Sequence, residues 1–141
     1  MSHISTIELE ITDLACLKKA CQSLNLKFNE GQKTYKWYGR LVNPANTPLP
    51  EGITEKDLGH CDHSISSTSA NYEIGILRRN GKYLLLADFW NAGGLHRVVG
   101  KNAGLLKQAY TVERVKNEAK KKGFRLTHKV TESSIRLTLT A

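Results

Sequence analysis

Residues 72–90 read YEIGILRRNGKYLLLADFW, and this stretch predicts the centre of the fold. From residue 72 to 77 an aromatic or β-branched side chain recurs at every second position, a period typical of a β-strand. Asn80-Gly81 is the favoured sequence of a two-residue type I′ turn, because both positions need a positive φ. Residues 83–90 then form the returning strand of a hairpin, and the apolar run Leu84-Leu85-Leu86-Ala87 places that strand inside a sheet.

Upstream of this hairpin, residues 4–11 predict a strand and residues 14–24 predict a helix. Ile7, Leu9 and Ile11 alternate with polar residues, which is the pattern of a half-buried strand. Thr12-Asp13 offers a helix N-cap. The helix is expected to bury a stripe that includes Cys21 and to leave Cys16 outside it; the stripe consists of Leu14, Leu17, Cys21 and Leu24.

The middle of the chain predicts short strands and one long loop. Residues 26–28 and 34–38 are rich in β-favouring side chains and flank Gly31, so they predict two short strands. Residues 39–70 hold all three prolines and a Ser/Thr-rich run from Ser64 to Ser69. A loop longer than about 15 residues in a compact domain is usually functional or disordered, so it is expected to be a lid or an insertion.

Downstream of the hairpin, a glycine-rich loop over residues 91–104 leads into a helix over residues 105–122. The cationic Lys120-Lys121-Lys122 and the following Gly123 are typical of a helix C-terminus. Residues 124–130 and 135–140 predict a closing hairpin. The long helix is expected to bury Leu105, Ala109, Val112, Val115 and Ala119.

These elements predict a single α+β domain over residues 1–141. The sheet is expected to be antiparallel or mixed with two helices packed on one face, and a pseudo-duplicated, ferredoxin-like arrangement is one form of it. No apolar run reaches the roughly 18 residues of a membrane helix, and the first residues lack a signal-peptide pattern, so we expect a cytoplasmic protein without a membrane partner. Three cysteines without a Cys-x-x-Cys spacing predict reduced thiols.

The positive charge of the chain is concentrated at its C-terminal end. The formal net charge is +8, and residues 101–141 hold ten Lys or Arg against three Asp or Glu, a surplus of seven. A clustered basic surface attracts polyanions such as nucleotides, nucleic acid or an acidic protein. An ordinary solvated basic helix face has the same composition.

The glycine-rich loop is the first candidate site. Glycines let backbone N–H groups approach an anion, and the following helix N-terminus and nearby cations favour phosphate. Asn102 stands where a Walker A motif has Ser or Thr, which disfavours magnesium-dependent NTP hydrolysis. The alternative is a connection whose glycines only satisfy turn geometry. The predicted phosphate-binding residues are Gly94, His96, Arg97, Gly100, Lys101 and Asn102.

Two further candidates rest on weaker patterns. The cluster His60-Cys61-Asp62-His63 has side chains that suit zinc, with His60, Cys61 and His63 as the metal candidates, and it supports an alternative hypothesis, a metal-dependent hydrolase. Lys107, Tyr110 and Arg114 are expected on the outer face of the long helix, as a nucleobase-stacking platform or a surface for homo-oligomer formation.

Asp88 ends an apolar strand and has no placed partner, so it is expected to be a hydrogen-bond anchor instead of a catalytic acid or base.

Several short motifs resemble a family of conserved hypothetical proteins of algal plastids and cyanobacteria that has relatives in bacteriophages. The stretches 60–63 and 101–104 look more like the phage branch. The resemblance implies a phage setting and the host cytoplasm, and it carries over no catalytic residue because the family is a domain of unknown function. The motifs are Met1-Ser2-His3-Ile4-Ser5, Tyr72-Glu73-Ile74-Gly75, Ala87-Asp88-Phe89-Trp90, Gln108-Ala109-Tyr110, Gly123-Phe124 and Ser134-Ile135-Arg136-Leu137.

From these patterns we expect a non-catalytic binding protein whose ligand carries phosphate, with no cofactor. The ligand is either a nucleotide, for example a host nucleotide signal sequestered by a phage protein, or a nucleic acid. The second hypothesis is the hydrolase just described. A third is an adaptor that binds another protein through the outer helix face or through residues 39–70.

Overall fold

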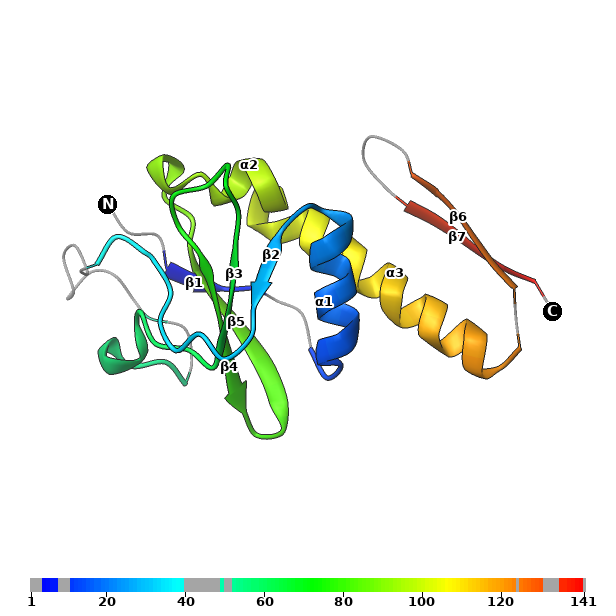
Figure 1. Cartoon of the computed structure of the whole chain (residues 1–141), viewed down its shortest axis with the longest axis horizontal. Helices are drawn as coiled ribbons and strands as arrows, with labels where there is room; N and C mark the ends of the chain where they lie inside the picture. Colours follow the sequence, from blue (N-terminus) through cyan, green and yellow to red (C-terminus); the bar gives the residue numbers. More distant parts are fainter. Residues whose placement is uncertain are drawn as a thin grey trace.

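The computed structural model describes residues 4–7, 11–39, 49, 52–123, 125–130 and 135–140 (Figure 1). Helices and strands make up most of the described chain, with η denoting short 3₁₀ helices. In chain order they are β1 (Ile4–Thr6), α1 (Leu14–Ser23), β2 (Lys27–Asn29), η2 (Glu55–Asp57), β3 (His63–Ser66), β4 (Ile74–Arg79), β5 (Lys82–Asp88), η3 (Asn91–Gly93), α2 (Leu95–Val99), η4 (Lys101–Ala103), α3 (Gly104–Lys121), β6 (Arg125–Val130) and β7 (Ile135–Thr140).

The first five strands form one antiparallel sheet in the order β1-β5-β4-β3-β2. The strands β1 and β2 lie at opposite edges and are connected through α1. The second long helix, α3, leads instead to β6 and β7, which form a separate two-stranded sheet. The α+β prediction is confirmed, and the described strands after α3 do not repeat the first half of the chain.

The β4–β5 hairpin forms as its sequence predicts. Arg79 pairs with Lys82, and the two residues between them have positive φ values, 52° for Asn80 and 76° for Gly81. These values suit a type I′ turn, whose twist matches that of the flanking strands. The strand β5 lies between β1 and β4, so its predicted interior position in the sheet is also confirmed.

One face of the sheet, called here the helix face, packs against the helices. Its buried strand residues include Ile65, Ile74, Ile76, Leu85 and Ala87, which join side chains of α1, α2 and α3 in one core cluster. The helix α1 begins as predicted at the N-cap Asp13, whose Oδ1 accepts a hydrogen bond from the Cys16 backbone N–H at 3.0 Å. The predicted packing of two helices on one face is therefore correct.

The opposite face, called here the loop face, is covered by part of the stretch between β2 and β3. Leu77 and Leu86 point to this face and form a second cluster with covering side chains from irregular segments. The ring of Tyr35 lies directly on Gly75, where a Cβ atom would come within 2.5 Å of it. The covering side chains are Tyr35, Ile53, Leu58 and Cys61, with Trp37 and Leu49 at the margin.

Two predictions about this middle stretch are wrong. Residues 34–38 form no strand; Thr34 makes only an isolated bridge with His60, because this segment covers the sheet and does not extend it. The predicted loop over 39–70 contains β3, which pairs with both β2 and β4 and buries Ile65. Its proline-containing part, apart from Leu49, lies outside the described residues.

The buried faces of both helices differ from the predicted stripes. In α3, Leu105 is 45% exposed, whereas Leu106 and Tyr110 are buried. In α1, Cys16 is buried against expectation, and Cys21 is buried as expected, which raises the pKa of its thiol to about 12. The cause is tertiary: α1 and α3 pack against each other as well as against the sheet, so each buries a wider face than one stripe.

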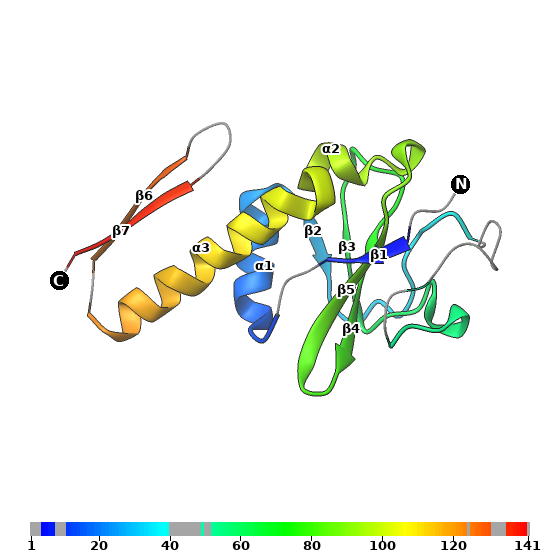
Figure 2. The same cartoon turned by 180° about the vertical axis from the view of Figure 1, so that it is seen from behind.

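The helix α3 extends beyond the edge of the sheet, and the β6–β7 hairpin turns back alongside the C-terminal half of this helix (Figures 1 and 2). Gly123 follows the helix with a φ of 72°, the left-handed conformation expected of a C′ glycine. Among the described residues, no helix combines the length and apolar character needed to cross a membrane.

Candidate functional site

The predicted phosphate loop is a chain of short helical turns, formed by η3, α2 and η4. Its backbone donors are already used within the turns: the N–H groups of Gly94, Arg97 and Gly100 donate to the carbonyls of Asn91, Gly94 and His96. An open cradle of N–H groups is therefore not formed by these three residues, because each N–H points along the turn that contains it.

Packing explains two of the glycines in this segment. A Cβ at Gly94 would lie 2.7 Å from Nη2 of Arg97, which folds back over it, and a Cβ at Gly100 would lie 2.9 Å from the Leu105 side chain. His96 packs edge-on against Phe89, with ring centroids 4.8 Å apart. Arg97, Lys101 and Asn102 are exposed, and phosphate binding by these predicted residues stays a prediction.

The predicted stacking platform on α3 is wrong at its central residue. Tyr110 is 3% exposed, and its hydroxyl accepts hydrogen bonds from the backbone N–H groups of Thr12 (3.2 Å) and Asp13 (3.3 Å). Arg114 contacts the same helix start, with Nη1 3.2 Å from the Thr12 hydroxyl and 3.8 Å from Asp13 Oδ2. Tyr110 and Arg114 thus join α3 to the beginning of α1, and Lys107 is half-buried beside them.

The predicted metal ligands do not converge. His60 is exposed, Cys61 is buried and donates its thiol hydrogen to the Gln32 carbonyl at 3.1 Å, and Nδ1 of His63 accepts from the Gly31 N–H at 2.9 Å. Burial raises the pKa of Cys61 to about 11, which disfavours the thiolate that zinc needs. In the described part of the chain, no three His, Cys, Asp or Glu side chains form a group that could hold a metal.

Asp88 is a buried hydrogen-bond anchor, as expected. Its side chain is fully buried, and its two carboxylate oxygens accept from the backbone N–H groups of Tyr38 (3.2 Å) and Trp90 (3.1 Å). These bonds tie the end of β5 to the segment that covers the loop face.

A polar pocket that the sequence did not single out lies at the β2–β3 edge of the sheet. Its volume is about 350 Å³, within the range of small-ligand pockets. Lys27 and Ser66 are paired in the β2–β3 register, and the chain that follows β3 closes the other side. The lining residues are Asn25, Lys27, Lys36, Ser66, Ser67, Thr68, Ala70, Asn71 and Glu73.

The described lining of the pocket carries a surplus of positive charge, two lysines against one glutamate. Lys27 and Lys36 are exposed, and neither forms an ion pair with a described residue. The single carboxylate, Glu73, accepts through Oε1 from the Lys36 backbone N–H (2.9 Å) and from Gln32 Nε2 (3.2 Å). The Glu73 carboxylate is therefore hydrogen-bonded to donors other than the ammonium groups of Lys27 and Lys36.

Hydrogen bonds outside the pocket orient its wall. The Lys36 carbonyl accepts from the Glu73 N–H at 2.9 Å, so the Lys36 backbone is bonded to residue 73 in both directions. Asn29 Nδ2 donates to the hydroxyl oxygens of Ser64 and Ser66, each at 3.0 Å. Because Ser66 accepts this bond, its own O–H is left to donate to a ligand.

The sequence contains one signal for this pocket, the Ser/Thr-rich run from Ser64 to Ser69, which lies within the predicted loop over residues 39–70. Lys27 and Lys36 carried no pattern of their own, because single lysines on short irregular segments are common. The two lysines line the same pocket only because residues 33–37 fold back against β4.

Comparison with known proteins finds no matching family model, curated protein or solved structure.

Proposed function

We propose that the protein is a non-catalytic binding protein for a small phosphate-bearing ligand, such as a nucleotide, and that the pocket at the β2–β3 edge is its site. One observation carries the proposal: Lys27 and Lys36 line the same pocket without an ion-pair partner among the described residues. Charge-assisted hydrogen bonds from ammonium groups to phosphate oxygens are about twice as strong as neutral ones.

The other lining groups support the same ligand class. The hydroxyls of Ser66 and Thr68 can donate to phosphate or ribose oxygens, and the amides of Asn25 and Asn71 can accept or donate at the rim. No general acid–base pair or nucleophile with an adjacent base is evident among the lining residues, which favours binding over catalysis. A volume of about 350 Å³ suits one small molecule.

Isothermal titration calorimetry with inorganic pyrophosphate, ATP and GTP tests this proposal. We expect saturable binding of at least one of the three, weakened by about tenfold or more in the double variant Lys27→Ala/Lys36→Ala, since two charged hydrogen-bond donors are lost. The matched control is Lys19→Ala/Lys33→Ala, which removes the same charge from two exposed lysines outside the pocket.

Two results would contradict the pocket assignment. One is a lack of binding to all three probes at low salt; the other is an equal loss of affinity in the pocket variant and its control. A third variant, Arg97→Ala/Lys101→Ala, tests the segment predicted from the sequence. If only this variant loses binding, the phosphate site lies on α2 and η4 instead.

The remaining expectations belong to the same proposal. Membership of the plastid, cyanobacterial and phage family, the sequestration of a host nucleotide signal, a cytoplasmic location and self-association all stay predictions. Native mass spectrometry of the purified protein measures oligomeric state and retained ligand together. A copurified mass of a few hundred daltons that absorbs like a nucleobase would support the sequestration role.

A further inference from the structure

A second surface, on the opposite face of the sheet from the pocket, carries three neighbouring aromatic rings. Phe28, His63 and Tyr83 come from β2, β3 and β5 and are all half-buried. The ring centroids of Phe28 and His63 are 5.6 Å apart, and those of His63 and Tyr83 are 6.3 Å apart. The rings are tilted by 35° and 52°, so neighbouring rings are not stacked face to face.

Register places these rings on the helix face. Phe28 pairs with Ile65 and His63 pairs with Ile76, two residues of the main core, and Tyr83 pairs with Arg78. Because successive strand residues point to opposite faces, Phe28 and the pocket residue Lys27 face away from each other. The two surfaces can therefore be tested separately.

Cations flank the row at both ends. The ammonium group of Lys18 lies 5.4 Å from the centre of the Phe28 ring and 3.0 Å from Glu30. At the other end, Arg78 is exposed beside Tyr83, and its guanidinium forms no ion pair with a described residue. These five side chains, Lys18, Phe28, His63, Arg78 and Tyr83, are called the aromatic strip.

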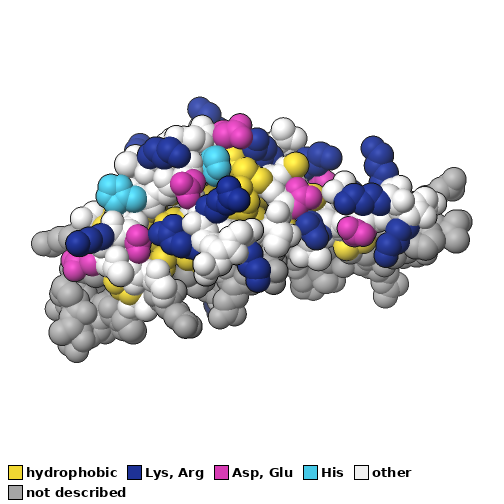
Figure 3. All heavy atoms as spheres, turned by 90° about the horizontal axis from the view of Figure 1, so that it is seen from below, with side chains coloured by type: hydrophobic (Ala, Val, Ile, Leu, Met, Phe, Trp, Pro, Cys, Tyr) yellow, Lys and Arg dark blue, Asp and Glu magenta, His cyan; other side chains and the backbone are white. Residues whose placement is uncertain are grey.

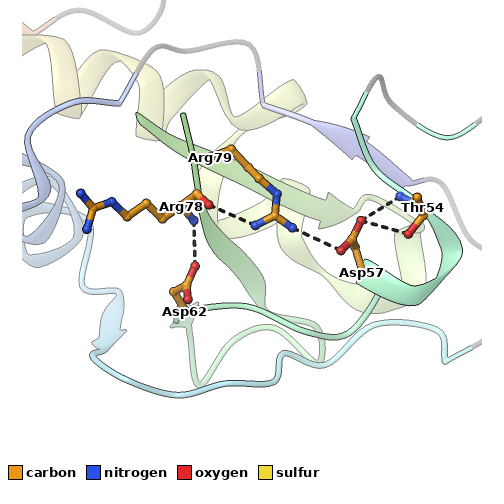
Figure 4. A network of polar contacts seen from close by, with 5 residues as sticks. All are labelled: Thr54, Asp57, Asp62, Arg78 and Arg79. Carbon is orange, nitrogen blue, oxygen red and sulfur yellow. Dashed lines mark hydrogen bonds and ion pairs between the residues drawn. The ribbon is translucent and has the colours of Figure 1, made fainter. Parts of the chain in front are cut away.

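The neighbouring arginines of β4 differ sharply in their surroundings. Arg79 points to the loop face, where Nη2 lies 3.2 Å from Asp57 Oδ1, and Asp57 in turn accepts from Thr54 (Figure 4). The side chain of Arg78 points away from this network, while its backbone N–H donates to Asp62 and its carbonyl accepts from Arg79 Nη1 at 3.0 Å (Figure 4). Because no acidic side chain in the described part of the chain pairs with the Arg78 guanidinium, this cation can meet an external anion.

We propose that the aromatic strip binds single-stranded nucleic acid, with bases on the rings and phosphates on Arg78. Sheet surfaces that carry aromatic side chains on neighbouring strands bind single strands in this way, because every base offers a π-face and the backbone meets adjacent cations. The two acidic groups nearby are already paired, Glu30 with Lys18 and Asp62 with the Arg78 N–H and with Lys33 at 4.0 Å.

The wider charge distribution favours the same ligand. Figure 3 shows hydrophobic and histidine side chains that reach the surface together, with Lys and Arg around them, Asp and Glu interspersed, and further Lys and Arg toward α3. The net charge of +8 attracts a polyanion over a longer range. An acidic protein segment would meet the same charges but would not need the rings.

Fluorescence anisotropy with a labelled oligo-U of about 12 nucleotides, a length within the range of single-strand sites, tests the proposal. We expect Arg78→Ala to weaken binding by about tenfold, as for the loss of one charged contact. Arg79→Ala is the matched control, because it removes the same charge from the next residue on the other face. Its affinity should stay close to that of the unsubstituted protein.

A second variant separates stacking from charge. Phe28→Leu keeps an apolar side chain against the core but removes the π-face, and we expect it to weaken binding by about tenfold, the loss typical of one stacked base. Circular dichroism and thermal unfolding establish that each variant is folded. The pocket variant Lys27→Ala/Lys36→Ala should still bind oligo-U, and Phe28→Leu should still bind the pyrophosphate or nucleotide probe.

Three outcomes would overturn the proposal. Binding of an RNA duplex as tightly as oligo-U would indicate general charge attraction, and so would equal losses in Arg78→Ala and Arg79→Ala. An absence of oligo-U binding at about 50 mM salt, a low concentration that favours electrostatic binding, would leave the strip to a protein partner. Each of these results leaves the pocket proposal intact, because that proposal rests on other residues and another probe.

Discussion

The two faces of the five-stranded sheet are held in different ways. On the helix face, side chains such as Leu17, Ile74 and Leu85 have no exposed surface and belong to one large cluster with three helices. On the loop face the cluster of described residues is smaller, and of its six buried members only Leu86 has no exposed surface. The loop face depends more on individual contacts, including the Arg79–Asp57 ion pair.

This difference indicates where the chain gains stability and where it can carry a binding site. Burial of apolar surface is the main favourable term in folding, so the helix face is expected to dominate the free energy of unfolding. The candidate pocket lies at the margin of the loop face, where polar side chains do not have to be covered by a helix. The aromatic strip lies at the open margin of the helix face.

The largest expected effect is the loss of packing between α1 and the helix face. We expect Leu17→Ala to lower the free energy of unfolding by about 2–5 kcal/mol, the cost of a large-to-small change in a closed core. Leu58→Ala on the loop face should cost less, about 2 kcal/mol at the lower end of this range, because Leu58 belongs to a smaller cluster of the described residues. Chemical denaturation measures both, and an equal or larger cost for Leu58→Ala would break the comparison.

A smaller effect is expected from adding one methyl group to the loop face. Gly75→Ala places a Cβ about where the Tyr35 ring lies, 2.5 Å from its nearest atom, so the covering segment must move. Overpacking of this kind costs about 1–3 kcal/mol. Gly104→Ala is the control, since its Cβ meets no atom within 4 Å and its φ of −57° suits any residue. Thermal unfolding measures the stability of both variants. If Gly75→Ala and Gly104→Ala were both as stable as the unsubstituted protein, close contact between residue 75 and the Tyr35 ring would be refuted.

The smallest expected effect on stability comes from the N-cap of α1, one of the helices that pack on the helix face. Asp13→Ala should cost about 1 kcal/mol near pH 7, because α1 loses its N-cap acceptor. The hydrogen bond from the Cys16 backbone lowers the pKa of Asp13, further aided by Arg114, against an opposing effect of burial. A lowered pKa means that the carboxylate stabilises the fold above its ordinary pKa of about 4 and that this contribution fades as the pH falls through the folded-state value.

The gap in stability between Asp13→Ala and the unsubstituted protein should therefore narrow when denaturation is repeated at acidic pH. If this difference in stability stayed constant down to about pH 2, well below the ordinary Asp pKa of about 4, the charge of the Asp13 carboxylate would contribute nothing to the stability of the fold. Asp13→Asn serves as the control, because an asparagine side chain still caps a helix and carries no charge.

Local sequence patterns predicted the regular elements of this protein and missed the covering segments. The Asn80-Gly81 turn, the Asp13 cap and the Gly123 stop each depend on the backbone preferences of one or two residues, and all three are present. Residues 34–38 contain good strand formers but lie across the loop face, where the ring of Tyr35 is buried on Gly75.

Local sequence patterns also failed to predict which residues come together at the candidate sites. Tyr110 looked like an exposed aromatic on a basic helix, but the start of α1 supplies two N–H donors for its hydroxyl from about a hundred positions away. His60, Cys61 and His63 are neighbours in sequence and diverge in space. The pocket instead brings together lysines from two segments and part of the Ser/Thr-rich run, which lies within the predicted loop over residues 39–70.

The sequence by itself determined the α+β class, the central hairpin, the two long helices and the concentration of positive charge toward the C-terminus. These features follow from periodicity, turn chemistry and composition, which act within a few residues. The tertiary structure alone decided which side of each helix is buried, which lysines share a pocket, and that Arg78 and not Arg79 is left without an acidic partner in the described chain. Such features depend on contacts between segments that are distant in sequence, because a polar group can be buried where a remote residue forms a hydrogen bond with it.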